Sequence, residues 1–300
     1  MNTSINRPAV DENSATSPGD KELIRAATDG NGNEMRRLLG LGADPRADRS
    51  HALAGAILTG RPELVELLLD HGADPSADSA GFLCRAVWTN RLSILNLLLA
   101  QGAQADDDES RALREAALRG HAGLVLRLIE AGADPKARDS QALANACGRE
   151  HMTVIEILLG KGADPTSPWA RALSSAARKG HIRAVRRLLR TPINQTGEDA
   201  ARAIIQASEK GHLHIVRCLL DWGVDSNIDD SAALVAAAAR GHLPIVACLL
   251  HAGADPAARG FFAAQCARGN GYPDVARLLM RTVSSRPRED AEEPTVAPSS

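Results

Sequence analysis

The chain has 300 residues, a formal net charge of −2 and 24% charged residues. Such a balance excludes a long charged polymer and argues against bulk attraction to nucleic acid or to an anionic membrane. Alanine fills 53 positions while only 2% of the residues are aromatic, which excludes a large core packed with rings.

Neither a membrane helix nor an export signal is expected from the sequence. No apolar run approaches the roughly 20 residues that span a bilayer. The N-terminal segment, MNTSINRPAVDENSATSPGD, lacks the apolar stretch of an export signal, and the five cysteines are an odd number without a CxxC pair. This cysteine usage is typical of neither a disulfide framework nor a zinc ribbon. We therefore expect a cytoplasmic protein without a bound metal.

The sequence repeats itself at a fixed interval. Each unit has one position, here called the turn position, that recurs nine times along the chain. The turn positions are Gly30, Gly60, Asn90, Gly120, Glu150, Gly180, Gly211, Gly241 and Gly271, so every step is 30 in the numbering except one of 31. The predicted repeats run roughly over 20–48, 49–78, 79–108, 109–138, 139–168, 169–198, 199–229, 230–259 and 260–281.

Apolar columns within the repeats predict two short helices per unit. Alanine lies four residues before every turn position, and leucine or isoleucine lies seven before it in eight units, with Ala264 in the ninth. An apolar pair follows eight and nine residues after it. Spacings of three and four favour amphipathic helices, and a glycine at the turn position can end the first helix in a left-handed conformation.

A second helix-ending motif follows each predicted second helix. Most units carry Gly-Ala-Asp-Pro or a close variant there, as in Gly132–Pro135. Glycine caps the helix and the proline cannot continue it, so a short hairpin-like turn, the finger, leads into the next unit. Because one helix pair is too small to bury its own apolar face, the units must stack into a solenoid.

These motifs resemble those of ankyrin repeats. The phrase Ala-Ala-Leu-Arg-Gly-His at 116–121, an apolar pair and Ala-Gly-Ala-Asp-Pro at 131–135 carry the resemblance, which recurs over residues 20–281. It implies an all-α solenoid of stacked helix-turn-helix units. The family's usual unit is longer and opens with Thr-Pro-Leu-His, so shorter fingers are expected here.

The ends and one joint depart from the pattern. Residues 1–19 and 282–300 are polar and are predicted to be disordered. Repeat 6 ends in Thr191-Pro192-Ile193-Asn194 and the next unit has one extra residue, which predicts a change of curvature between repeats 6 and 7.

We find no constellation for catalysis or cofactor binding. The nine histidines include a Gly-His histidine recurring about once per repeat, and neighbouring helices pack about 8 to 10 Å apart, too far to share a zinc ion. The resemblance implies a structural hydrogen-bonding role for this histidine. By the same spacing Cys218 and Cys248 are packing residues, and the acidic run 106–109 is interpreted as a solvated turn. Enzyme activity is not expected.

The resemblance implies a concave groove, lined by the first helices and the fingers, that holds a partner protein. Repeats 4 to 8 have a basic side chain one residue before the turn position. Repeats 2 to 4 have an apolar side chain two residues before the turn position. Tryptophan and arginine dominate many interfaces, so Trp222 and Trp169 are further candidates. The predicted partner-binding residues are Leu58, Trp88, Leu118, Arg119, Arg149, Arg178, Lys179, Lys210, Trp222 and Arg240. The alternative interpretation is that the basic residues only complement the helix dipole and that Trp88 packs on its neighbour.

The sequence therefore predicts a monomeric scaffold that binds another protein, or an acidic segment of one. One alternative is a bacterial effector or regulator that sequesters a target, since arginine outnumbers lysine 30 to 5, as in proteins of GC-rich genomes. Delivery into a host cell stays open under this alternative. Nucleic-acid binding through the basic residues ranks lower, because no aromatic residues for base stacking interleave with them. In register, all seven aromatic residues, Phe82 included, are expected outside the core columns.

Overall fold

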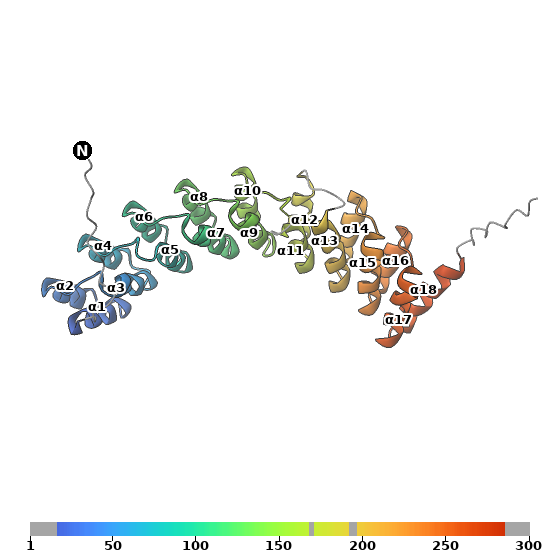
Figure 1. Ribbon diagram of the computed structural model, residues 1–300, viewed down its shortest axis with the longest axis horizontal. Helices are drawn as coiled ribbons and strands as arrows, with labels where there is room; N and C mark the ends of the chain where they lie inside the picture. The colour runs from blue at the N-terminus through green and yellow to red at the C-terminus, as the bar shows by residue number, and fades with distance from the viewer. Residues whose placement is uncertain (1–16, 168–170, 192–196, 286–300) are drawn as a thin grey trace, which may run out of the picture. The chain divides into compact units, whose positions relative to one another are not determined.

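The computed structural model describes residues 17–167, 171–191 and 197–285. Over these ranges it contains 18 α-helices and no strand (Figure 1). The chain divides into two compact units, Met1–Ala137 and Arg138–Ser300. None of the helices in the described ranges is long and apolar enough to cross a membrane.

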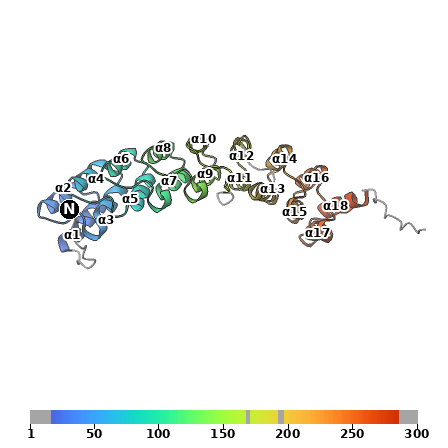
Figure 2. The same ribbon diagram turned by 45° about the horizontal axis from the view of Figure 1, so that its top comes forward.

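The first unit contains four helix pairs. Its helices are α1 (Pro18–Thr28), α2 (Gly32–Gly40), α3 (Ala47–Leu58), α4 (Pro62–Asp70), α5 (Ser79–Trp88), α6 (Leu92–Ala100), α7 (Asp107–Arg119) and α8 (Ala122–Glu130). The first helix of each pair contacts the first helix of the next, in the order α1, α3, α5 and α7, and α4, α6 and α8 form a second row in the same way (Figure 2).

The second unit repeats this arrangement with five pairs. Its helices are α9 (Ala137–Cys147), α10 (Met152–Gly160), α11 (Ala172–Lys179), α12 (Ile182–Leu188), α13 (Glu198–Lys210), α14 (Leu213–Trp222), α15 (Ile228–Ala239), α16 (Leu243–His251), α17 (Ala258–Gly269) and α18 (Pro273–Ser285). Helices α11, α13, α15 and α17 form the first-helix row, and α10, α12, α14, α16 and α18 form the second-helix row.

Every turn position has the predicted left-handed backbone. The angle φ lies between +51° at Asn90 and +85° at Gly180 in all nine repeats, including the two repeats without glycine. A residue in this conformation ends the first helix, and the chain can therefore reverse direction at the turn position. The ninth repeat keeps the register too, since Gly271 has a φ of +82°.

The predicted columns form the core. The alanines four residues before the turn positions are at most 5% exposed, and the leucines and isoleucine seven before them are fully buried. In the apolar pair of the second helix, the first residue is buried in every repeat, whereas the second is only half-buried in most. Small alanines on facing first helices allow close packing, so aliphatic side chains fill the space without rings.

The fingers contain a feature that the sequence patterns did not predict. In five of them three successive residues are left-handed, as at Asp108, Glu109 and Ser110. In four of these fingers the third residue is a buried serine whose hydroxyl accepts a hydrogen bond from the backbone N–H of the aspartate in the following Gly-Ala-Asp-Pro. The Oγ–N distances are 2.9 Å for Ser50–Asp74, 2.9 Å for Ser110–Asp134, 2.7 Å for Ser140–Asp164 and 3.2 Å for Ser231–Asp255. These serines tie each finger to the next.

Two predicted boundaries are corrected by the helix ends. Helix α1 begins at Pro18, inside the segment predicted to be disordered, because Ser17 and Asp20 form a reciprocal capping box at its start. Helix α18 continues past residue 281 to Ser285. The other residues of the two predicted tails, 1–16 and 286–300, lie outside the described residues. Trp169 and residues 192–196 of the joint after repeat 6 also lie outside them, so the change of curvature stays a prediction.

The expectation that every aromatic residue lies outside the core was wrong for Phe82. The residue is 1% exposed, and its side chain is the largest fully buried one in the part of the chain that the structure describes. It lies eight residues before the turn position, where seven other repeats have a buried alanine such as Ala112 or Ala142. This position in the first turn of α5 faces the core, so the Phe82 ring is packed in the core.

Candidate functional site

Three apolar side chains, here called the apolar patch, end consecutive first helices of the first unit. They are Leu58, Trp88 and Leu118, two residues before successive turn positions on α3, α5 and α7, which contact one another in sequence order. Leu58 is 51% and Trp88 48% exposed, whereas Leu118 is half-buried. Since exposed large apolar side chains in register are unusual on a helix surface with polar neighbours, the patch is a candidate contact surface.

Trp88 is held in place by two residues of the neighbouring helix. Its indole Nε1 donates a hydrogen bond of 2.8 Å to Glu115 Oε1, and the same oxygen pairs with Arg119 Nη2 at 2.7 Å. The Arg119 guanidinium lies 6.0 Å from the centre of the Trp88 ring. A large ring fixed before binding loses little conformational entropy when a partner covers it. The predicted residues Trp88 and Arg119 therefore belong to one pre-ordered cluster.

A hollow of about 310 Å³ lies at the turns of repeats 3 and 4. It is lined by residues 90, 92 and 120–124, two of which, Asn90 and Gly120, are the turn positions directly after the helices that carry Trp88 and Leu118. The exposed Leu92 adds an apolar side chain to its wall. The apolar patch residues Leu58, Trp88 and Leu118 are not among the residues that line this hollow.

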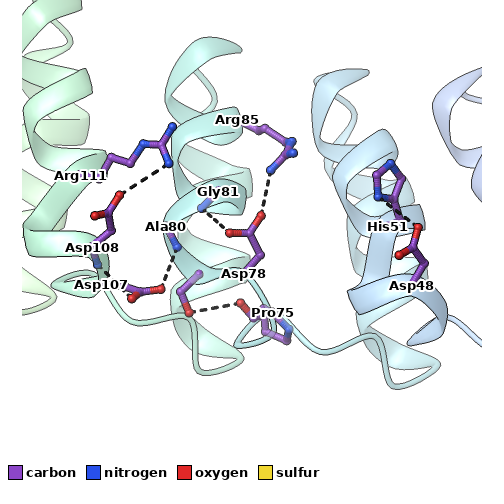
Figure 3. A network of polar contacts seen from close by, with 11 residues as sticks. Asp48, His51, Pro75, Asp78, Ala80, Gly81, Arg85, Asp107, Asp108 and Arg111 are labelled. Atoms are coloured by element: carbon purple, nitrogen blue, oxygen red, sulfur yellow. Dashed lines mark hydrogen bonds and ion pairs between the residues drawn. The ribbon is translucent and has the colours of Figure 1, made fainter. Parts of the chain in front are cut away.

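The acidic residues on the finger side of this unit are used in capping and ion pairs (Figure 3). Asp107 accepts hydrogen bonds from the backbone N–H of Ala80, at 3.1 Å, and of Asp108, at 2.9 Å. Asp108 lies 3.6 Å from Arg111 Nη1, and Asp78 caps α5 by accepting from Gly81 N–H at 3.1 Å. No group of three potential metal ligands exists in the described part of the chain.

The predicted basic residues differ in their surroundings. In the second unit, Glu209 Oε1 pairs with Lys210 at 3.2 Å and with Arg240 at 2.9 Å. The hydrogen bond from Lys210 lowers the pKa of the Glu209 carboxyl, with Arg240 adding to the effect. The single negative charge of Glu209 thus offsets one of the two positive charges at these predicted positions.

Three other basic residues of the second unit form no ion pair with the described residues. Arg149, Arg178 and Lys179, here called the basic cluster, are exposed and have no ion-pair partner among the described residues. They lie one or two residues before the turn positions of repeats 5 and 6. Such unpaired cations at first-helix ends attract anionic groups, although they also complement the helix dipole, as the alternative interpretation requires.

The recurring histidines are structural in three repeats. The Nε2 atoms of His181, His212 and His242 lie 3.2, 3.2 and 3.1 Å from backbone carbonyls of the preceding repeat. Each carbonyl belongs to the residue two before a turn position. The role implied by the family resemblance is confirmed by this geometry, which explains why these histidines recur.

The remaining candidates fall into two groups. Trp222 is half-buried at the end of α14, directly before the left-handed Gly223, and nothing else in the structure tests its predicted role. All five cysteines are free thiols. Burial raises the pKa of Cys84 to about 11, which leaves it protonated and unreactive at neutral pH.

The fold and these surfaces define a helical repeat solenoid. A family model described as ankyrin repeats (3 copies) matches residues 83–168 and 173–260, which together are more than half of the chain. The chain therefore belongs to the ankyrin repeat family, whose members are generally protein–protein interaction modules and typically non-enzymatic scaffolds. A search among curated proteins found no match to this chain.

Proposed function

We propose that this protein is a monomeric, non-enzymatic scaffold that binds a partner protein through the ends of its first helices. In the first unit the apolar patch supplies the anchor. The single observation that carries the proposal is the Trp88 side chain, which is half exposed yet fixed by Glu115 and Arg119. An exposed ring that is ordered in advance has the properties of an interface hot spot.

The basic cluster of the second unit favours a partner with an acidic segment. Arg149, Arg178 and Lys179 have no carboxylate partner in the described residues, and arginine binds carboxylates through two parallel hydrogen bonds. Sequestration of one target by an effector would use the same surfaces. Nucleic acid is a weaker candidate, because no exposed aromatic residue accompanies these cations in the described part of α9 to α12.

The test is affinity purification from lysate with the full chain as bait. The variants are Trp88→Ala, and a charge reversal that combines Arg119→Glu, Arg149→Glu and Lys179→Glu. We expect both variants to lose the partners that the native chain recovers, while circular dichroism shows unchanged helix content. Recovery of the same partners in the same amounts by both variants would refute the assignment of the binding surface.

A further inference from the structure

A second positive surface lies on the second-helix row, apart from the residues of the proposed function. Residues 171–190 contain seven arginine and lysine residues and neither aspartate nor glutamate. Three of these arginines follow one another along α12 and its end, and one arginine of α14 adjoins them. We call Arg183, Arg186, Arg190 and Arg217 the arginine face, and all four are exposed.

Two of these arginines share one face of α12. Arg183 and Arg186 are three residues apart on this helix, which brings side chains to the same face about 5 to 6 Å apart, and Arg190 lies two residues past the end of the helix at Leu188. Helix α14 contacts α12 directly, and Arg217 occupies the same repeat position on α14 as Arg186 does on α12. The arginine face therefore extends across two helices.

Carboxylates oppose only part of this charge. Glu150 accepts a hydrogen bond from the backbone N–H of Arg183 at 3.2 Å, and its other oxygen lies 3.7 Å from His181 Nδ1. On α10, Glu156 accepts two hydrogen bonds from Arg187, at 2.6 and 2.8 Å, and these bonds lower the pKa of its carboxyl. Arg190 acts on Glu156 only through its charge. Asp221 of α14 makes no ion pair with the described arginines. Arg183, Arg186 and Arg217 have no ion-pair partner among the residues that the structure describes.

The surroundings of the arginine face discriminate among anionic partners. None of the large apolar side chains that are exposed in the described chain belongs to α12 or α14. A single-stranded nucleic acid would need rings for stacking, and a membrane would need apolar side chains to insert. A partner held by carboxylates needs neither. The Arg187–Glu156 pair shows the two-bond geometry that a carboxylate adopts on this helix.

We infer that the arginine face is a second binding site, which takes an acidic segment of a partner protein. A helical segment with glutamates three and four residues apart matches the three-residue spacing of Arg183 and Arg186 on α12. The site is independent of the apolar patch, because it lies in the other unit and on the other helix row.

The experiment measures binding of the full chain to a fluorescein-labelled helical peptide with glutamates three and four residues apart, by fluorescence anisotropy at low salt. The test variant combines Arg183→Glu, Arg186→Glu and Arg190→Glu. The matched control combines Lys21→Glu, Arg36→Glu and Arg268→Glu, which reverses as many exposed charges outside the arginine face and the basic cluster. We expect the test variant to bind about tenfold more weakly and the control to stay within about twofold of the native chain.

Three outcomes would overturn the inference. They are an equal loss in the two variants, no binding by the native chain, and tighter binding of a DNA duplex of equal charge than of the peptide. Thermal unfolding followed by circular dichroism checks that both variants are folded. Trp88→Ala should leave peptide binding unchanged, so that failure of this site and failure of the proposed function are distinguished.

Discussion

The two units carry different side chains at the same repeat position. Two residues before the turn position, the four repeats of the first unit have Thr28, Leu58, Trp88 and Leu118, whereas the five repeats of the second unit have Gly148, Arg178, Glu209, Ala239 and Gly269 and so no large apolar side chain. The alanines two residues earlier are buried in both units, and all turn positions are left-handed. The comparison teaches that turn, alanine and finger positions maintain the stack, while neighbouring positions are free to differ and to determine what each unit binds.

The first prediction tests the shared scaffold and has the largest expected effect. Gly241 has a φ of +73°, and an added Cβ would collide with the Tyr272 ring. We expect Gly241→Ala to lower the free energy of unfolding by about 3 kcal/mol, from backbone strain and overpacking together. The control is Gly253→Ala, where φ is +92° but no atom lies within 4 Å, and it should cost about 1 kcal/mol. Equal midpoints in urea unfolding of the two variants would contradict the packing role of the turn position.

The second prediction concerns the serines that join the fingers. Ser110→Ala leaves the backbone N–H of Asp134 without its acceptor, which should cost about 1 to 2 kcal/mol of unfolding free energy. Ser93→Ala removes an exposed hydroxyl from α6 of the same unit and should change stability by less than about 0.5 kcal/mol. Urea unfolding of the two variants checks this difference, and a similar loss in both would show that the finger bond contributes nothing.

The third prediction concerns a buried carboxylate between two first helices of the second unit. Asp199, in the first turn of α13, accepts hydrogen bonds from the backbone N–H groups of Leu173, at 2.9 Å, and Ser174, at 3.2 Å, on α11. Burial raises the pKa of its carboxyl although these bonds oppose the shift. A raised pKa means that the folded chain binds the proton more tightly than the unfolded chain does. Acidification therefore stabilises the folded state while the pH falls from the pKa of Asp199 in the folded chain toward its pKa in the unfolded chain.

The corresponding measurement compares the native chain with Asp199→Asn by urea unfolding between pH 6 and pH 4. As pH falls, we expect the native chain to gain stability relative to the variant, by less than the effect of Ser110→Ala. A relative loss on acidification would show that hydrogen bonding outweighs burial at this carboxyl.

The smallest effect is expected at the two turn positions that lack glycine, one in each unit. Asn90 and Glu150 are left-handed, with φ of +51° and +58°. Asn90→Gly removes this strain and should raise the free energy of unfolding by about 0.5 kcal/mol. Glu150→Gly should gain less, because the Glu150 carboxylate accepts a hydrogen bond from the backbone N–H of Arg183 at 3.2 Å. Thermal unfolding of the two variants checks this order of stability gains. A larger gain for Glu150→Gly than for Asn90→Gly would contradict it.

The regular repeat was sufficient to predict the fold, because alanine, leucine and glycine recur at fixed distances from each turn. The buried serines were missed since only four of the nine repeats carry serine in that column, where others have alanine, aspartate or, at Phe261, a ring. Phe82 was misplaced because the alanine column eight residues before the turn was not recognised. The site was harder to predict, because Trp88 depends on Glu115 and the charge of Arg240 depends on Glu209. Those partners lie 27 and 31 residues away in sequence, in neighbouring repeats.

The central claim is that the apolar patch binds a partner protein, and two leucines of the first unit allow a matched test. Leu58 belongs to the patch and is 51% exposed, while Leu126 lies on the second-helix row and is 37% exposed. The measurement is quantitative affinity purification with Leu58→Ala and Leu126→Ala baits against the native chain. We predict at least about a tenfold loss of the recovered partner for Leu58→Ala alone. Equal recovery by the two variants would contradict the account.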